Sequence, residues 1–257
     1  MEEPPREPGG TLLIWDYDWS LINANSDTYV VEVLRPELMA RFSSRTTGWT
    51  ELMDSQVKEL FARGVTRSEL EAVVAQVPVL PGCLQAVAVA NAAQARQVVL
   101  SDANTIFIEA FLKKEGLRRC FSDIISNKAE FDGEGRLHIK PFHAEPPGCA
   151  LCPSNLCKGQ VLRQLLDREG PSRICYVGDG SGDFCPACQL RGAVENWGTP
   201  EGPEDLLLCR APPSPPLKRF GLLDRLTDPP SASQVVAKVV KWHTGEDLLA
   251  AVRTFLR

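Results

Sequence analysis

The sequence lacks any apolar run near the roughly 18 residues that a membrane-spanning helix requires. It also lacks an excess of basic residues, since its 257 residues carry a formal net charge of −5. Non-specific nucleic-acid binding needs a basic surface, so that class of protein is disfavoured. The first ten residues, MEEPPREPGG, lack the basic-then-apolar order of a signal peptide and are expected to form a flexible tail.

The cysteines are odd in number, nine in all, in a chain long enough to fold without disulfides. We therefore expect mostly free thiols and a reducing compartment, the cytoplasm. The hydrophobic fraction of 44% is typical of a globular protein, so a chain of this length predicts one large domain or two unequal ones.

Three short apolar runs have the length and residue types of strands buried on both faces of a parallel sheet: residues 11–15, 96–100 and 173–177. Helical patterns at 105–115 and 158–169 lie between the second and third runs. This alternation of strands and helices predicts an α/β doubly wound parallel sheet.

Polar residues follow each of these runs, and a doubly wound sheet binds ligands beyond the carboxyl ends of its strands. The polar residues are Asp16, Asp18, Ser101, Asp102, Asp179 and Asp183. Clustered carboxylates repel one another unless a cation is present, and hard oxygen ligands suit Mg²⁺. Lys158, at the start of a predicted helix, adds a positive charge. The set predicts a phosphoryl-transfer site, in which one carboxylate attacks phosphorus and another moves a proton.

The domain boundaries follow from a change of pattern after the first strand. Residues 26–89 carry helical spacing, including a capping box formed by Thr66 and Glu69, and predict a small helical cap. Residues 11–25 and 90–257 then form the core domain, and residues 1–10 the tail.

Three further segments have local signals of their own. A hairpin is expected at 121–139, where FDGEGRL supplies turn residues, and Thr244 is expected to cap a final helix. Residues 198–217 are rich in proline and glycine and predict a surface loop.

The order of the motifs resembles that of the haloacid dehalogenase (HAD) superfamily of phosphatases. D-x-D-x-[ST] is followed by S-D, then lysine, then G-D-x-x-x-D, as in Asp16-Tyr-Asp18-Trp-Ser20, Ser101, Lys158, and Asp179 with Asp183. Longer segments are similar to the phosphoethanolamine/phosphocholine phosphatase family: LSDANTIFIE, CALCPSNLCKG, YVGDGSGDFCP and WHTGEDL. That family includes plant-type relatives that act on thiamine monophosphate, pyridoxal phosphate or pyrophosphate. The resemblance implies a Rossmann-like HAD core with its cap inserted after the first strand.

The resemblance also implies roles for individual residues. Asp16 would be the nucleophile that forms an aspartyl-phosphate, and Asp18 the general acid and base. Ser101 would bind the transferring phosphoryl group, and Lys158 would pair with both nucleophile and phosphate. The implied ligands of Mg²⁺ are Asp16, Asp18 through its main-chain carbonyl, Asp179 and Asp183.

The first motif departs from the family's commoner FDFDxT and reads WDYDWS. Serine keeps the hydroxyl of threonine, whereas Trp19 is expected to narrow the entrance of the site. The resemblance therefore specifies the reaction type more closely than the substrate.

Two further acids, Asp27 and Asp102, have no implied phosphate or metal role. One interpretation is that they bind a cationic head group such as ethanolamine, choline or thiazolium, with cation–π support from Trp19, Tyr29 or Trp49. The other is that each only caps the helix that follows it.

A cysteine cluster, Cys149-x2-Cys152-x4-Cys157, lies six residues after His143. These four residues could form a tetrahedral zinc site, pack as buried thiols, or form a reversible disulfide that displaces Lys158. All three interpretations stay open at this stage.

Three functions are compatible with the motifs. The favoured one is an Mg²⁺-dependent phosphatase for a small phosphomonoester. The others are a phosphate-ligand sensor without turnover, and phosphoryl transfer to an acceptor other than water or from a protein. The sensor predicts loss of Asp16, Asp18 or Asp179, and all three are present.

Overall fold

The computed structural model of the chain describes residues 9–44, 46–192, 194–196, 199–201, 204–212 and 218–257. Most of the predicted tail, residues 1–8, and parts of the predicted loop at 198–217 lie outside the described residues.

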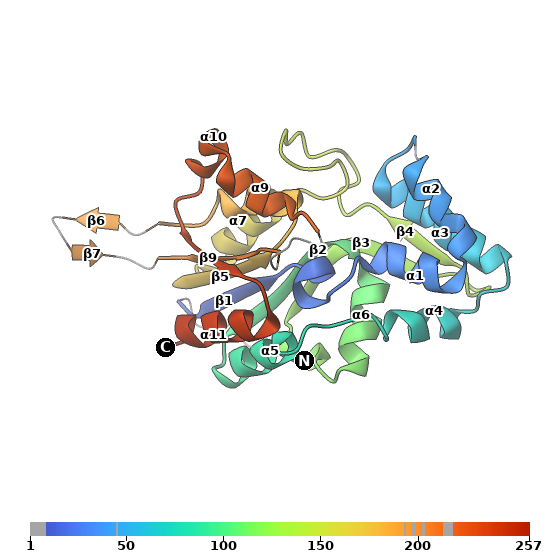
Figure 1. The fold of residues 1–257 in the computed structure, drawn as a ribbon, viewed down its shortest axis with the longest axis horizontal. Coiled ribbons are helices and arrows are strands. Elements are labelled where there is room, and N and C mark those ends of the chain that lie inside the picture. Colours follow the sequence, from blue (N-terminus) through green and yellow to red (C-terminus); the bar gives the residue numbers. More distant parts are fainter. Residues whose placement is uncertain (1–8, 45, 193, 197–198, 202–203, 213–217) are drawn as a thin grey trace. The chain divides into compact units, whose positions relative to one another are not determined.

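Within the described residues, the strands form a seven-stranded sheet in the order β4-β3-β2-β1-β5-β8-β9, and β6 and β7 form a two-stranded sheet (Figure 1). The strands are β1 (Thr11–Trp15), β2 (Arg96–Asn104), β3 (Asp123–Phe131), β4 (Leu137–Lys140), β5 (Arg173–Gly178), β6 (Val194–Asn196), β7 (Thr199–Glu201), β8 (Leu206–Arg210) and β9 (Lys238–Trp242). The pairs β1–β5, β5–β8 and β8–β9 are parallel, whereas β3–β4 and β6–β7 are antiparallel. The predicted parallel α/β fold is therefore confirmed.

The helices occupy the intervals between strands. The α-helices are α1 (Ser26–Leu34), α2 (Ala40–Ser43), α3 (Trp49–Ala62), α4 (Arg67–Val74), α5 (Cys83–Ala92), α6 (Thr105–Lys114), α7 (Lys158–Glu169), α8 (Phe184–Ala187), α9 (Gly221–Thr227), α10 (Pro229–Ala232) and α11 (Gly245–Phe255). In the described part of the chain, the shorter turns of 3-10 or π type are η1 (Tyr17–Leu21), η2 (Pro36–Met39), η3 (Arg118–Cys120) and η4 (Ser181–Asp183).

The chain divides into two compact units. Unit 1 comprises Met1–Trp15, Pro81–Val98 and Lys158–Arg257, and unit 2 comprises Asp16–Leu80 and Val99–Cys157. Helices α1 to α4 fall within the predicted cap, residues 26–89, whereas α5 belongs to unit 1. The boundaries of the predicted core and cap stay a prediction.

Unit 1 has its core around β1 and β5. Leu12 to Trp15 are at most 1% exposed, because α5 and α11 cover one face of these strands and α7 covers the other (Figure 1). The buried indole of Trp15 donates to Gln97 Oε1 at 3.1 Å, and Gln97 Nε2 donates to the carbonyl of Val87 at 3.0 Å. The polar atoms of this core are thus hydrogen-bonded, as burial requires.

The starts of α5 and α11 meet at two glycines. Gly82 has a φ of +90°, and a Cβ built there would lie 2.3 Å from the carbonyl oxygen of Gly245. Thr244 caps α11 as predicted, accepting from Asp247 N at 3.1 Å. This cap and the glycine contact determine where the last helix begins.

Unit 2 contains the predicted hairpin and the predicted capping box. Strands β3 and β4 pair across the turn that ends at Arg136. In the capping box, Thr66 Oγ1 accepts from Glu69 N, and Glu69 Oε2 accepts from Thr66 N at 2.8 Å. Helix α3 begins at Trp49, within the segment predicted to be helical.

Two strands of the sheet were not predicted. Leu206–Arg210 forms the buried strand β8 inside the region predicted as a surface loop, and Lys238–Trp242 forms β9. The apolar run of the first is obscured by its proline- and glycine-rich neighbours. The second is mostly exposed, so it lacks the pattern of a buried strand.

Candidate active site

The ends of β1 and β5 lie side by side in unit 1. Trp15 pairs with Val177 near the ends of these strands. The residues that follow the strands, Asp16 and Asp179, therefore leave the carboxyl edge of the sheet at neighbouring positions. A carboxylate oxygen from each of Asp16, Asp179 and Asp183 lies within 4.8 Å of the others, and all three residues are buried. The structure thus brings together three of the acids predicted from the motifs.

Asp183 is held by four donors. Lys158 Nζ and the Tyr176 hydroxyl each donate to Oδ1 at 2.8 Å, and the amides of Asp179 and Gly180 each donate to Oδ2 at 3.0 Å. A side chain at Gly178 would collide with the Asp183 carboxyl group, at 2.7 Å from its oxygen. Asp183 therefore orients the loop that carries Asp179, and it orients Lys158.

The Asp179 carboxyl group has a raised pKa in this cluster. The pKa of Asp179 is raised to about 7, chiefly by burial and then by repulsion from Asp183, against the opposing charges of Lys218, Lys158 and Arg210. Lys218 Nζ lies 3.7 Å from Asp179 Oδ2. A cation beside these acids would relieve both the desolvation and the repulsion.

This donor set fits a divalent metal ion of the hard type. Carboxylate oxygens alone converge there, with no sulfur or imidazole among the described group. Asp183 already accepts four hydrogen bonds, so its carboxylate oxygens are largely occupied by protein donors.

Asp18 lies in unit 2, on the tight turn η1. Its Oδ1 accepts from Ser26 N at 2.9 Å and its Oδ2 from Asn25 Nδ2 at 3.1 Å. Burial, followed by repulsion from Asp27, raises the pKa of Asp18 to about 8. Trp19, with φ +59°, sits in the left-handed region and turns the chain so that its amide donates to the carbonyl of Ala24 at 3.0 Å.

Asp27 is buried beside Trp49, whose indole N–H donates to Asp27 Oδ2 at 2.6 Å. The pKa of Asp27 is raised to about 7, chiefly by burial, with the indole hydrogen bond lowering it and the charge of Asp102 raising it. Asp27, Trp49, Met53 and Asp102 are among the residues that line a narrow pocket in unit 2.

Neither Asp27 nor Asp102 caps a helix, so that alternative interpretation is wrong. Asn25 caps α1, accepting from Thr28 N, and Asn104 caps α6, accepting from Phe107 N, because an asparagine stands immediately before each helix. Asp102 is an exposed residue of β2.

Ser101 is fully buried next to Asp102 in β2, and its Oγ accepts from Ala103 N at 3.4 Å. The main-chain carbonyls of Asp102 and Ala103 accept from Asn127 Nδ2 at 2.7 and 2.9 Å. Sequence reasoning missed Asn127, because its position in a hairpin strand carries no motif.

Sequence reasoning also missed Tyr176, Lys218 and Arg210 around the acids of unit 1. Tyr176 is part of an apolar strand, and the other two basic residues follow the last motif at no regular spacing. The sequence did carry a signal for Asn25, which donates to Asp18, because Asn25 stands immediately before the predicted helical segment.

Three of the four predicted zinc ligands lie together, and His143 is not among them. Cys149, Cys152 and Cys157 lie together, and the fourth residue of the described group is Cys185, not His143. His143 stacks edge-on against Phe142 at 5.0 Å between ring centres.

Among the described residues, no helix has the length and apolar character to cross a membrane.

Comparison with known proteins identifies the family. The sequence profile named Putative Phosphatase matches residues 11–197, well over half of the chain. The chain belongs to this phosphatase family. The resemblance to HAD phosphatases of the phosphoethanolamine/phosphocholine type is thereby confirmed.

Curated relatives support the same assignment. This phosphatase is 32% identical over 244 residues to Inorganic pyrophosphatase 2 of Arabidopsis thaliana, covering 92% of this chain and 80% of the relative. It is 35% identical over 187 residues to the Thiamine phosphate phosphatase-like protein of the same plant, covering 70% and 76%. The phosphatase is accordingly a phosphoric monoester hydrolase.

Solved structures show the fold. A HAD family hydrolase from Salmonella enterica matches with a TM-score of 0.56 at 15% identity, over 99% of this chain and 73% of that chain. The phosphatase therefore has the HAD-like α/β fold.

Proposed function

We propose that the phosphatase hydrolyses a small phosphomonoester through an aspartyl-phosphate on Asp16, with Mg²⁺ as its metal ion. The convergence of Asp16, Asp179 and Asp183 within 4.8 Å supports this proposal more than any other observation. Mg²⁺, when bound, supplies positive charge that stabilises the developing charge on the phosphoryl oxygens. Asp16 and Asp179 would hold it, with the main-chain carbonyl of Asp18, and Asp183 would act through water or through its neighbours.

The reaction then has two steps. Asp16 attacks phosphorus while the bond to the ester oxygen breaks, and Asp18 gives its proton to that leaving oxygen. Water then attacks the aspartyl-phosphate, Asp18 takes a proton from it, and inorganic phosphate leaves with Asp16 restored. A pKa of about 8 keeps Asp18 largely protonated at neutral pH, which suits the first step. Ser101 and Lys158 would bind the phosphoryl oxygens.

Asp16→Asn tests the nucleophile. We expect loss of turnover with an unchanged melting temperature, because an amide cannot form the acyl phosphate. Asp167→Asn, at an exposed position of α7, is the matched control and should keep full activity. Retained activity in Asp16→Asn would contradict the assignment.

For the substrate, the acids of unit 2 favour a cationic head group such as ethanolamine or choline. Asp27 is buried next to the ring of Trp49, and Asp102 adds a second negative charge. Two such acids beside an aromatic ring would attract a small cation by charge and by cation–π interaction. Thiamine monophosphate and pyridoxal phosphate stay alternative substrates for the same chemistry.

Pyrophosphate is a second candidate with an observation in its favour. Lys218 and Arg210 place positive charge near Asp179, where an anionic leaving group would need it. A relative in Arabidopsis thaliana carries the name Inorganic pyrophosphatase 2.

One assay separates these candidates. Phosphate release is measured from phosphoethanolamine, phosphocholine, thiamine monophosphate, pyridoxal phosphate, glycerol 3-phosphate and pyrophosphate, with Mg²⁺ and with EDTA. We expect activity to need Mg²⁺ and kcat/KM to be highest for the cationic esters. A preference for pyrophosphate would overturn the head-group assignment, and undiminished activity in EDTA would overturn the metal assignment.

A further inference from the structure

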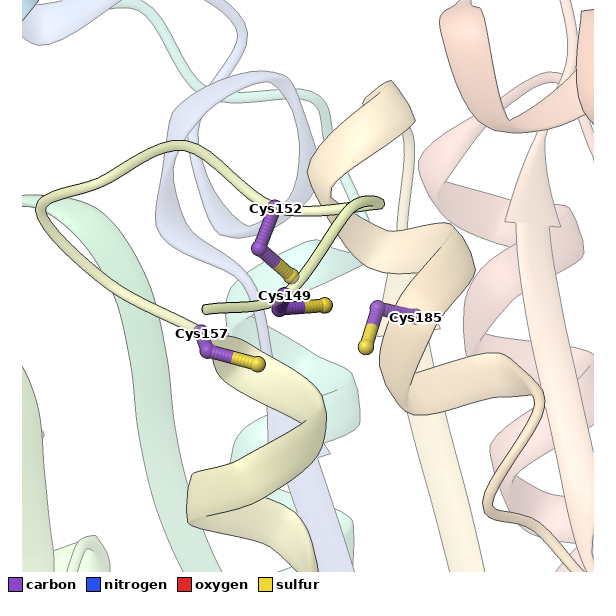
Figure 2. Close-up of side chains that lie close together, drawn as sticks. All are labelled: Cys149, Cys152, Cys157 and Cys185. Atoms are coloured by element: carbon purple, nitrogen blue, oxygen red, sulfur yellow. The ribbon is translucent and has the colours of Figure 1, made fainter. Parts of the chain in front are cut away.

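A second group of convergent ligand atoms consists entirely of sulfur. The Sγ atoms of Cys149, Cys152, Cys157 and Cys185 all lie within 4.8 Å of one another. Figure 2 shows three of these side chains on the loop that leads into α7 and the fourth on α8, with their sulfur atoms turned toward one another.

Local structure explains how the thiols meet. Cys149 and Cys152 are separated by a two-residue turn, and Cys157 is the residue immediately before α7. Cys185 is brought to the start of the same helix by Gly159, where a Cβ would lie 2.4 Å from Cys185 Sγ. Glycine at this position therefore allows the fourth sulfur to approach.

The spacing of the sulfurs suits a metal ion better than a disulfide. A tetrahedral ion with zinc–sulfur bonds of about 2.3 Å places its ligands about 3.8 Å apart, inside the observed limit. A disulfide needs about 2.05 Å between two of the sulfurs and would leave the other two unused. Among the described residues, no cysteine forms a disulfide.

We propose that Cys149, Cys152, Cys157 and Cys185 bind one zinc ion as a structural site. Soft thiolate ligands in a set of four select zinc, and a full set of protein ligands leaves no position for a substrate. On binding, each thiol loses its proton to solvent, so four protons are released for each ion. The positive end of the α7 dipole favours the thiolate of Cys157.

The burial of the four residues agrees with such a site. Cys157 and Cys185 are buried, whereas Cys149 and Cys152 are half-buried and leave the ion a route from solvent. The ion would fasten the 149–157 loop to the start of α7, where Lys158 directly follows a ligand. The site would thus hold Lys158 in place without contacting the substrate.

The test measures metal content and sulfur ligation in the purified, reduced protein. We expect one zinc ion per chain, with excess Mg²⁺ present to occupy the carboxylate site. Replacing zinc with Co²⁺ should produce the thiolate-to-cobalt charge-transfer absorption and the intense visible bands of a tetrahedral site. A strong chelator should lower the melting temperature of the unmutated protein, and added zinc should restore it.

Variants identify the ligands. Cys185→Ser and Cys152→Ser should lose the charge-transfer absorption and bind zinc at least tenfold more weakly. Cys188→Ser, three residues beyond Cys185 and outside the group, is the matched control and should bind normally. His143→Ala should also bind normally.

Several outcomes would overturn the proposal. One is reduced, unmutated protein that contains no zinc and gives no charge-transfer absorption with Co²⁺. Others are loss of binding in His143→Ala with retention in Cys185→Ser, and a disulfide within the group in protein purified under reducing conditions. The unmutated-protein arm keeps the test decisive if a cysteine variant fails to fold.

Discussion

Replacing Trp49 with phenylalanine removes one hydrogen bond from Asp27 while keeping an aromatic ring at that position. The indole N–H donates to Asp27 Oδ2 at 2.6 Å, and it is the one hydrogen bond that lowers the raised pKa of this buried acid. A hydrogen bond to a charged group contributes about 1.5–3 kcal/mol, which corresponds to about one to two pH units. The pKa of Asp27, about 7 in the unmutated protein, should rise by that amount.

The consequence for substrate binding follows from the ionised fraction of Asp27. At pH 7 that fraction should fall from about one-half to between about one-tenth and one-hundredth. If the ionised carboxylate binds the cationic head group, KM for phosphoethanolamine at pH 7 should rise about 5- to 50-fold. The loss should shrink toward pH 9, where Asp27 is again ionised.

The assay follows phosphate release from phosphoethanolamine and from glycerol 3-phosphate between pH 6 and pH 9. Glycerol 3-phosphate has an uncharged head group, so its KM should hardly change. Gln76→Ala is the matched control, since it removes an exposed hydrogen bond to the carbonyl of Ala72 in the same unit. Equal changes in KM for both esters, or none for either, would refute the reasoning and leave Asp27 a structural residue.

Three predictions concern stability. Burial raises the pKa of Asp27 to about 7, against about 3.9 in the unfolded chain. Its contribution to the free energy of unfolding is therefore full below about pH 4 and is lost as pH rises through 7. Asp27→Asn should therefore gain up to about 4 kcal/mol relative to the unmutated protein between pH 4 and pH 8, in urea unfolding without metal; a pH-independent difference would contradict this. Asp205, buried and ion-paired with the half-exposed Arg191 at 2.9 Å, also accepts from the buried Ile174 N, so Asp205→Ala should lower the free energy of unfolding by about 1–3 kcal/mol by leaving that donor without its acceptor. Gly82→Ala should lower the melting temperature clearly, since its Cβ would overlap the carbonyl of Gly245; an unchanged value would show that the two helix starts move apart freely.

The sequence alone determined the parts of the protein that depend on local patterns. Strands β1 and β5 were predicted because buried parallel strands read as short apolar runs, and each ends at an acid of the motifs. Helices α7 and α11 were predicted with their starting residues, because helical spacing and a threonine cap are local signals. The order of the motifs was likewise sufficient to predict the phosphatase family.

The tertiary structure decided which side chains meet. Asp27 lies 22 residues from its donor Trp49, and Lys158 lies 25 residues from Asp183. The sulfur group likewise contains Cys185 rather than His143, although His143 is nearer to the other cysteines in the sequence. Strand β8 follows the same rule, because its place in the sheet comes from pairing with β5 and β9.

The physical reason is the range of the interactions. Propensity, capping and periodicity act over a few residues and can be read along the chain. Desolvation, ion pairing and metal coordination depend on neighbours that only folding supplies, so the pKa values of Asp18, Asp27 and Asp179 are properties of the fold.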